Sequence, residues 1–256
     1  MGCRSRTPSS SRSYGKRRVS RTLALLLPAT LLVAATLPLG SVTISPVSVH
    51  LAYGQKSASL NVRNTRREPM SVQMRIYRWT QDGEEDVLSP TSDVVLSPPM
   101  ATIASGTTQT LRLLMRPSPT SAARQERHYR ILLDEIPSAA ARPGQLNFAL
   151  RSSIPLFATT EKPVAPHLEW RAVRGNNKTV ILIGTNTGLA YDRVVTLAAT
   201  LPDGTTLNAA PRALNPYILP GSQRQWVVRE MVVGDTIDLA VVTIKGRSDQ
   251  SLPIGQ

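Results

Sequence analysis

Residues 145–157 have the sequence QLNFALRSSIPLF, in which apolar side chains recur at almost every second position. Successive side chains of a β-strand point to opposite faces, so this alternation predicts a strand with one apolar face. That face carries Leu146, Phe148, Leu150, Ser152, Ile154 and Leu156. Pro155 lies on the other face and cannot donate a ladder hydrogen bond, which favours a sheet edge or a strand end. An exposed apolar edge is an aggregation hazard unless it pairs with another chain, and the alternative is that these are core residues of their own domain.

The segments around this stretch show the same β character. Short apolar or alternating runs are separated by clusters of Pro, Gly and polar residues, and no run keeps a helical period for ten residues. Seven strands within about 120 residues are typical of an immunoglobulin-like sandwich. We predict these seven at residues 42–51, 57–64, 70–79, 93–96, 108–115, 128–136 and 145–157.

The pattern starts again after a proline-bearing polar segment, TTEKPVAP, at residues 159–166. The strands predicted beyond it are 168–172, 179–185, 194–200, 206–207, 224–233 and 236–244. The predicted fold is therefore all-β, with two immunoglobulin-like β-sandwich domains. The predicted boundaries are 1–41 for a leader, 42–158 for the first domain, 159–166 for the linker and 167–256 for the second domain.

The first forty residues have the features of a secretory signal. Seven Arg and Lys residues and no acidic residue precede the uncharged apolar run LALLLPATLLVAATLPL at residues 23–39. The run is shorter than the roughly 20 residues of a membrane span and contains Pro28. We expect export, cleavage near residues 40–42 and no stable membrane insertion afterwards. An uncleaved anchor is the alternative, and Arg17-Arg18 also permits twin-arginine export.

About half of the net positive charge lies in the leader, and the rest is spread along the mature chain. The net charge is +13, and removing the seven leader charges leaves 13 − 7 = +6 without a Lys/Arg block. Two Phe residues provide no aromatic platform for single-stranded nucleic acid, so we expect no nucleic-acid partner.

Residues for catalysis or metal binding are not grouped in this sequence. The single cysteine, Cys3, lies in the leader, which leaves the mature chain without a disulfide or a thiolate. His50, His128 and His167 stand apart from one another and from any metal-binding spacing. We therefore expect no cofactor, no metal and no enzymatic activity.

Three stretches together resemble the periplasmic chaperones of the chaperone–usher pilus pathway. They are ISPVSVHLAYGQKSASLNVRN at residues 44–64, ERHYRILLDEIP at 126–137 and QLNFALRSSIPLF at 145–157, with support from YILPGSQRQW at 217–226. The resemblance implies two immunoglobulin-like domains set at an angle, a periplasmic location, and pilin subunits and an outer-membrane usher as partners. It also implies that 145–157 completes a pilin's unfinished sandwich, with Leu146, Phe148 and Leu150 inserted and Ile154 as a further contact.

The resemblance also suggests residues for two charge sites. Arg112 and Glu126 match residues that the family uses in an interdomain charge network, although a solvated surface pair is the alternative. Typical members bind the pilin's terminal carboxylate with an Arg and a Lys, but the matching positions here are Ser48 and Pro155. This departure resembles the divergent, archaic branch. We expect Arg130 to supply the cation instead, with Arg151 and Arg127 as further candidates.

The competing function is that of an exported structural protein, such as a pilin or an adhesin-like β-sandwich. A pilin would have one incomplete sandwich with a donor extension, usually with a cysteine pair. Two predicted domains and a mature chain without cysteine disfavour that alternative.

Overall fold

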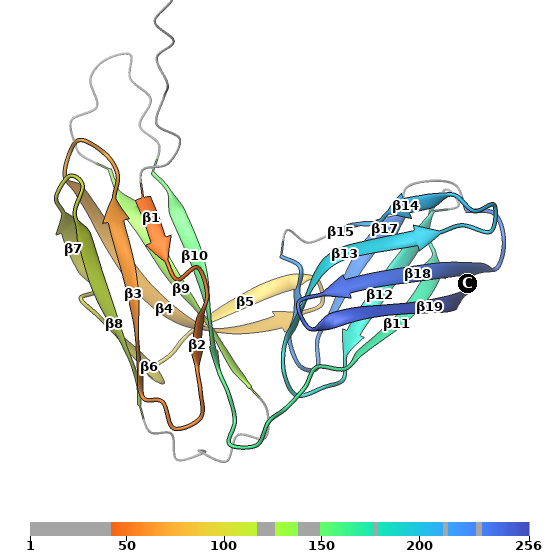
Figure 1. Ribbon diagram of the computed structural model, residues 1–256, viewed down its shortest axis with the longest axis horizontal. Coiled ribbons are helices and arrows are strands. Elements are labelled where there is room, and N and C mark those ends of the chain that lie inside the picture. Colours follow the sequence, from red (N-terminus) through yellow and green to blue (C-terminus); the bar gives the residue numbers. More distant parts are fainter. Residues whose placement is uncertain are drawn as a thin grey trace, which may run out of the picture. The chain divides into compact units, whose positions relative to one another are not determined.

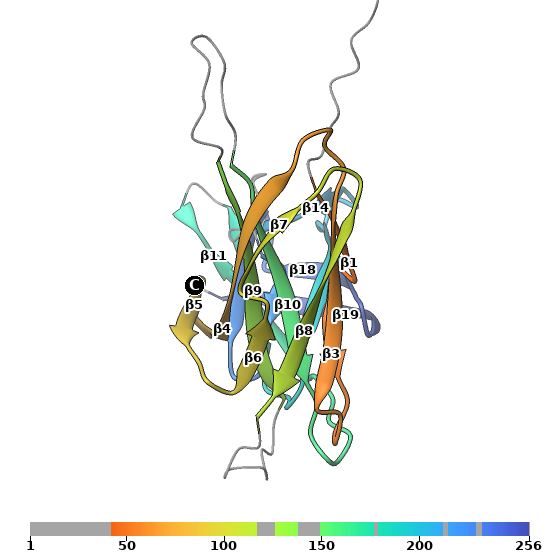
Figure 2. The same cartoon turned by 90° about the vertical axis from the view of Figure 1, so that its left-hand side faces the viewer.

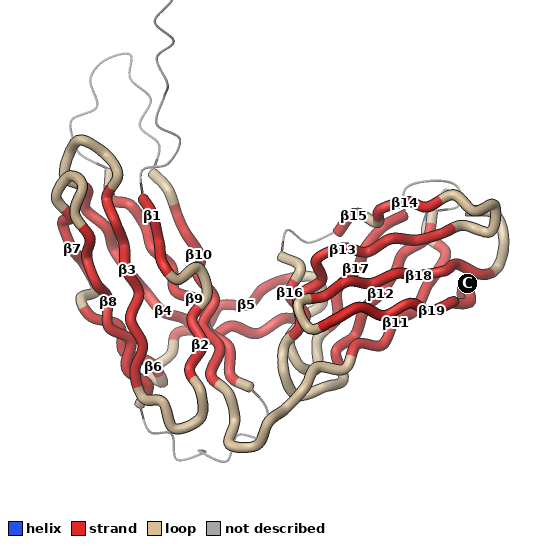
Figure 3. Tube along the Cα trace, in the orientation of Figure 1, coloured by secondary structure: helices blue, strands red, loops and turns tan. Residues whose placement is uncertain are grey.

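The computed structural model describes residues 42–116, 126–137, 149–176, 179–211, 215–228 and 232–255. All the regular elements among them are strands (Figure 3), which confirms the predicted all-β fold. Residues 38–256 form one compact unit. No helix in the described ranges is long and apolar enough to cross a membrane.

The first domain consists of two packed sheets (Figures 1 and 2). The smaller sheet has the order β1-β3-β8-β6, with β1 at Val42–Ser45, β3 at Ser57–Asn64, β8 at Thr108–Met115 and β6 at Val94–Ser97. The larger sheet has the order β2-β10-β9-β4-β5, and β7 also pairs with β4. Its strands are β2 (Val49–Leu51), β10 (Arg151–Ala158), β9 (Arg127–Ile136), β4 (Met70–Asp82), β5 (Glu85–Pro90) and β7 (Met100–Ile103).

Alternation along the strands produces the core between these sheets. On β9, Tyr129, Ile131 and Leu133 point inward and are at most 1% exposed. They pack with the inward residues of the neighbouring strands, which include Val72, Met74, Ile154 and Leu156. The side chains of alternate β9 residues, Arg130 and Asp134 among them, therefore lie on the outer face of the larger sheet.

The second domain is a nine-stranded sheet with the order β14-β13-β18-β19-β11-β12-β17-β15, and β16 pairs with β13 (Figures 1 and 3). Its strands are β11 (Leu168–Arg174), β12 (Val180–Asn186), β13 (Asp192–Thr200), β14 (Thr206–Asn208), β15 (Ala210–Pro211), β16 (Tyr217–Ile218), β17 (Gln223–Val228), β18 (Thr236–Thr243) and β19 (Gly246–Gly255). Trp170 and Trp226 lie in its core with ring centroids 5.1 Å apart. Gly184 faces Trp170, and a Cβ there would lie 2.7 Å from the indole, so only glycine fits.

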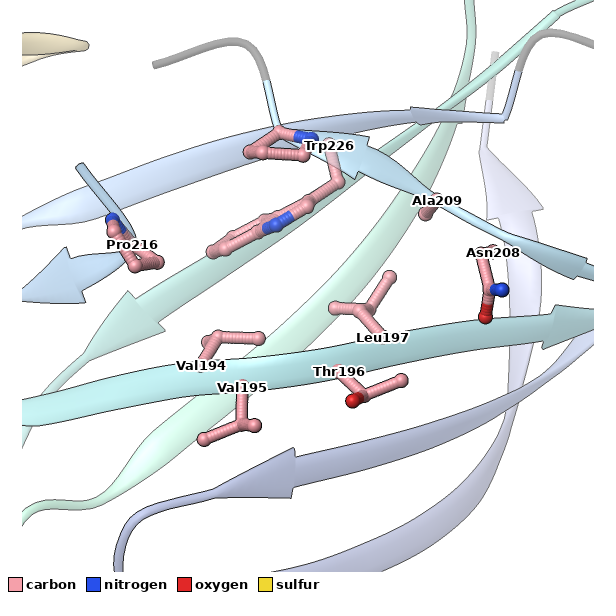
Figure 4. Close-up of a pocket in the computed structure, with 9 residues that line it drawn as sticks. Val194, Val195, Thr196, Leu197, Asn208, Ala209, Pro216 and Trp226 are labelled. Carbon is pink, nitrogen blue, oxygen red and sulfur yellow. The ribbon is translucent and has the colours of Figure 1, made fainter. Parts of the chain in front are cut away.

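A pocket opens beside β13 in the second domain (Figure 4). Val194 and Leu197 are buried on the side of β13 where Trp226 lies, whereas Val195 is 58% exposed. The pocket lies where β13 has a register irregularity between its pairings with β16 and β14.

Several predicted strand bounds differ from the structure. The expected strand 42–51 is two strands in different sheets, because β1 pairs with β3 whereas β2 pairs with β10. The strand predicted at 145–157 is described only from Arg151 onward, as β10. Five strands are absent from the prediction, namely β5, β7, β19 and the two-residue strands β15 and β16.

Candidate functional site

Strand β10 is paired on both sides along only part of its length. All eight of its residues pair antiparallel with β9. On the opposite side, β2 pairs in parallel with residues 156–158 only. No described strand pairs with residues 151–155 on that side, so this half of β10 has an open edge. Pro155, which favours a sheet edge or a strand end because it has no backbone N–H, lies within this open half.

The backbone groups along this open edge can be assigned from the ladder. Glu135 N donates to Leu150 O at 3.0 Å, so even-numbered residues of this segment bond toward β9. Thr159 N donates to Leu51 O of the β2 side at 2.9 Å, so odd-numbered residues bond the other way. In an antiparallel pair the direction alternates at every residue. The amides of Arg151 and Ser153 therefore point to the open edge, and Pro155 provides only a carbonyl there.

Next to the open edge, the guanidinium of Arg130 lines a pocket of about 340 Å³. The other lining residues are Asp86, Leu88, Ser153, Asn215 and Pro216, so both domains contribute. Arg130 lies opposite Pro155 in the β9–β10 ladder, on the outer face of the sheet. The pocket is thus at the end of the open half of β10.

Arg130 is a buried cation held mainly by aromatic rings. It is 8% exposed, and its guanidinium carbon lies 3.7 Å from the ring centroid of Trp79 and 5.4 Å from that of Tyr217. Among the described residues, its guanidinium donates no hydrogen bond, and the one carboxylate within ion-pair distance is Oδ2 of Asp86 at 3.9 Å. Burial lowers the pKa of Arg130 from its ordinary value, although an arginine remains charged at neutral pH. A buried guanidinium with unused donors is suited to binding a carboxylate.

Asp86 is the centre of the polar contacts between the two domains. Its carboxylate accepts hydrogen bonds from the Arg224 guanidinium and from the Asn215 side-chain amide. Arg224 is 2% exposed and also donates to Gly83 O at 3.1 Å. Nearby, the Gln81 side chain bonds to Tyr217 O at 3.0 Å and to Leu219 N at 3.0 Å.

An apolar cluster next to Arg130 also joins the two domains. Trp79 and Phe157 of the first domain pack with Tyr191 and Leu219 of the second. The rings of Phe157 and Tyr191 are stacked with centroids 3.6 Å apart. Glu126 adds a polar contact, since its Oε2 accepts a hydrogen bond from Tyr191 N at 3.0 Å. The closed half of β10 is therefore part of the contact between the domains.

Comparison with known proteins assigns the first domain to a family. Residues 41–162 match the family described as pili and flagellar-assembly chaperone, PapD N-terminal domain. Over these residues, which make up the first domain, the chain is similar to the pilus-assembly chaperones. No curated protein sequence matches it significantly.

Solved structures of pilus chaperones have the same two-domain fold as this chain. A chain of the CsuC-CsuE chaperone–tip adhesion subunit pre-assembly complex, from archaic chaperone-usher Csu pili of Acinetobacter baumannii, is 23% identical, with a TM-score of 0.61 over 85% of this chain and 100% of that one. A chain of the Salmonella enterica SafA pilin–SafB chaperone complex is 18% identical (TM-score 0.56; 84% and 96%). The E. coli chaperone DraB is 21% identical (TM-score 0.55; 83% and 95%). These likenesses confirm two immunoglobulin-like domains.

The structure distributes the predicted donor residues over three environments. Leu146 and Phe148 lie outside the described residues. Leu150 is 45% exposed, just before β10 begins. Ile154 is 3% exposed and packs in the core of the first domain, where it is not available for insertion into another chain. Its burial follows from β2 and β9, which fix the face of β10 that points into the sandwich.

The residues predicted for charge sites are also separated. Arg112 is exposed on β8 in the smaller sheet, and no described residue forms an ion pair with it. Glu126 does reach the second domain, but through the amide of Tyr191 and not through an arginine. Ser48 bonds to His50 at 3.0 Å, and Arg151 bonds to Asp134. Arg127, at the start of β9, does not line the Arg130 pocket.

The ion pair between the domains was not found from the sequence. Its members, Asp86 and Arg224, are separated by 138 residues. The acidic turn DGEED at residues 82–86 was the available signal, because three consecutive acidic residues in a hairpin favour a cationic partner.

Proposed function

We propose that this chain is a periplasmic chaperone that binds pilin subunits along the open edge of β10 and delivers them to an outer-membrane usher. The observation that carries this proposal is a strand whose first half presents unpaired backbone groups while its second half is fixed within the domain. Unpaired edges attract other chains, and addition of a strand is a common mode of peptide recognition. The printed descriptions of similar structures include complexes of a chaperone with a pilin or a tip subunit, which supports the same partner class here.

The side chains that enter the subunit are proposed to lie just before β10. Leu150 is exposed, and Leu146 and Phe148 continue its alternating face toward the N-terminus. Burying such side chains in an apolar groove stabilises a complex by about 1.5–3 kcal/mol each. The subunit would thereby receive the strand that its own sandwich lacks.

Arg130 is proposed to bind the subunit's terminal carboxylate. It lies opposite Pro155, where the open edge of β10 ends, and its donors are unused among the described residues. A bound strand with its C-terminus at Arg130 would run parallel to β10, from the Arg151 end to the Pro155 end. Ser48 and Pro155 provide no positive charge, which supports membership of the archaic branch.

The proposal also covers enzymatic activity, cellular location and domain limits. The members of this family are chaperones, and we propose that this chain has no enzymatic activity. The leader at residues 1–41 would direct it to the periplasm and be removed near residues 40–42. The domain limits proposed for the mature protein are 42–158 and 167–256, joined by 159–166.

Substitution of donor residues tests strand donation. Leu150→Asp would place a charge in the subunit's apolar groove, where desolvating it costs several kcal/mol. We expect a pilin co-expressed in the periplasm to stop co-purifying with Leu150→Asp and with Phe148→Asp. The neighbour Ala149→Asp, which faces the other way, is the matched control and should bind normally. Normal pilin binding by both Leu150→Asp and Phe148→Asp would contradict strand donation.

A further inference from the structure

The pocket beside Arg130 contains more than a site for a carboxylate. Its lining includes two apolar side chains from different domains, Leu88 of β5 and Pro216. Leu88 is 37% exposed although it is apolar, and it lies on the edge strand of the larger sheet. A volume of about 340 Å³ lies at the lower end of the roughly 300–1,000 Å³ that is usual for ligand pockets, so the last residue of a bound chain can enter it.

The polar part of the lining is equally specific. The Arg130 guanidinium is the cation, and the Ser153 hydroxyl adds a donor. Asn215 is held in place, since it donates to Asp86 and its Oδ1 accepts from Tyr217 N at 3.2 Å. Asp86 also lines the pocket, but its carboxylate already accepts hydrogen bonds from Arg224 and Asn215, which leaves Arg130 as the cation available to a bound carboxylate.

We infer that this pocket selects the side chain of the subunit's last residue, and that it favours an uncharged, apolar one. The carboxylate binds Arg130, and the side chain packs between Leu88 and Pro216. This inference rests on the proposed function, because it assumes a strand on the open edge of β10. It adds that the second domain, through Pro216 and Asn215, takes part in choosing the subunit.

Synthetic peptides test the selection directly. The probes are acetylated heptapeptides of alternating Thr and Val that differ only in the last residue, which is Leu, Asp, Lys or Leu amide. Their affinities for the mature chaperone are measured by NMR titration. We expect the Asp and Lys peptides to bind about tenfold more weakly than the Leu peptide, because burial of a Leu side chain is lost. The amide should bind at least about tenfold more weakly, because the charge-assisted bond is lost.

A matched pair of variants tests the wall of the pocket. Leu88→Asp adds a carboxylate to the pocket on an exposed strand, and we expect the preference to change from the Leu to the Lys peptide. Val87→Asp adds the same charge one residue earlier, where the side chain points away and does not line the pocket. It should leave the order of affinities unchanged, and the thermal unfolding of both variants reports whether they fold.

The outcomes separate the inference from the function on which it rests. Equal binding of the Leu, Asp and Lys peptides, or equal effects of Leu88→Asp and Val87→Asp, would overturn the selection. Equal binding of the Leu peptide and its amide would remove Arg130 as the carboxylate site. Strand donation would still stand in both cases if Leu150→Asp abolishes pilin binding.

Discussion

The two halves of strand β10 differ in what surrounds them. Residues 151–155 pair with β9 alone, and Arg151 and Ser153 are exposed. Residues 156–158 are held between β9 and β2, and Phe157 is fully buried against the second domain. One continuous strand thus combines a fixed half, which belongs to the core and the domain contact, with an open half that is free to pair.

The boundary between the halves explains why the open edge is tolerated. A free edge is a hazard when it is long, flat and apolar. Within the described strand β10 it is five residues long, and Pro155 removes a donor from it. Only the amides of Arg151 and Ser153 are presented, so few wrong partners can pair in register. The fixed half keeps this short edge in one geometry for a subunit.

The largest effect should come from the fixed half. Phe157→Ala removes a ring with 0% exposure that stacks on Tyr191, and should lower the free energy of unfolding by about 3–5 kcal/mol. Ser153→Ala in the open half should change it by less than about 0.5 kcal/mol. Urea unfolding measures both, and equal costs would remove the distinction between the halves.

A smaller effect is expected at the ion pair between Asp86 and Arg224, which joins the two domains. Asp86→Asn leaves the Arg224 guanidinium buried without its counter-charge, which should cost about 3 kcal/mol. Asp249→Asn is the control, because both partners of its pair with Arg247 are exposed to solvent and the loss of such a pair changes stability little. Thermal unfolding compares the two variants, and a similar change in both would show that Asp86 is only a surface charge.

The smallest effect should come from the ion pair between Asp134 of β9 and Arg151 in the open half of β10. The Arg151 guanidinium, with help from Arg75, holds the pKa of Asp134 below its ordinary value, although burial opposes this. A carboxylate whose pKa is lowered by folding stabilises the protein at pH values above its pKa in the unfolded chain, which is about 3.9. It loses that effect as the pH falls below this value. Because Arg151 is exposed, Asp134→Asn should cost less than about 1 kcal/mol at pH 7.

The pH dependence supplies the check on that prediction. The stability difference between the native protein and Asp134→Asn should be constant between about pH 5 and 7 and shrink below about pH 4. Urea unfolding across this range measures it. A difference that grows as the pH falls would contradict the assignment of the lowered pKa to the arginines.

The fold could be predicted where burial imposes a pattern. The strands predicted at 57–64 and 108–115 agree with β3 and β8, since alternate residues of both enter the core. Strand β5 was missed because it is exposed on both faces and shows no alternation. Strand β19 was missed because its sequence, GRSDQSLPIG, is polar and contains proline, and only its last part is buried.

Only the part of the site that lies on strand β9 could be predicted from the sequence. The YRILL stretch drew attention to Arg130, and the structure places this residue in a pocket at the end of the open edge. The rest of the pocket comes from β5 and from the segment before β16, which approach Arg130 only through the contact between the domains. No local spacing encodes such an approach, which is why Asp86, Leu88 and Asn215 were absent from the prediction.

Amide hydrogen exchange of β10, followed by NMR with and without a pilin subunit, tests the central claim most directly. In the free protein the amides of Arg151 and Ser153 should exchange fast, because they point to the open edge, whereas those of Ser152 and Ile154 should be protected by β9. Binding of a subunit should slow Arg151 and Ser153 by about 100-fold or more and leave the protection of Ser152 and Ile154 in place. Fast exchange of Arg151 and Ser153 in a stable complex would show that the subunit does not pair with this edge.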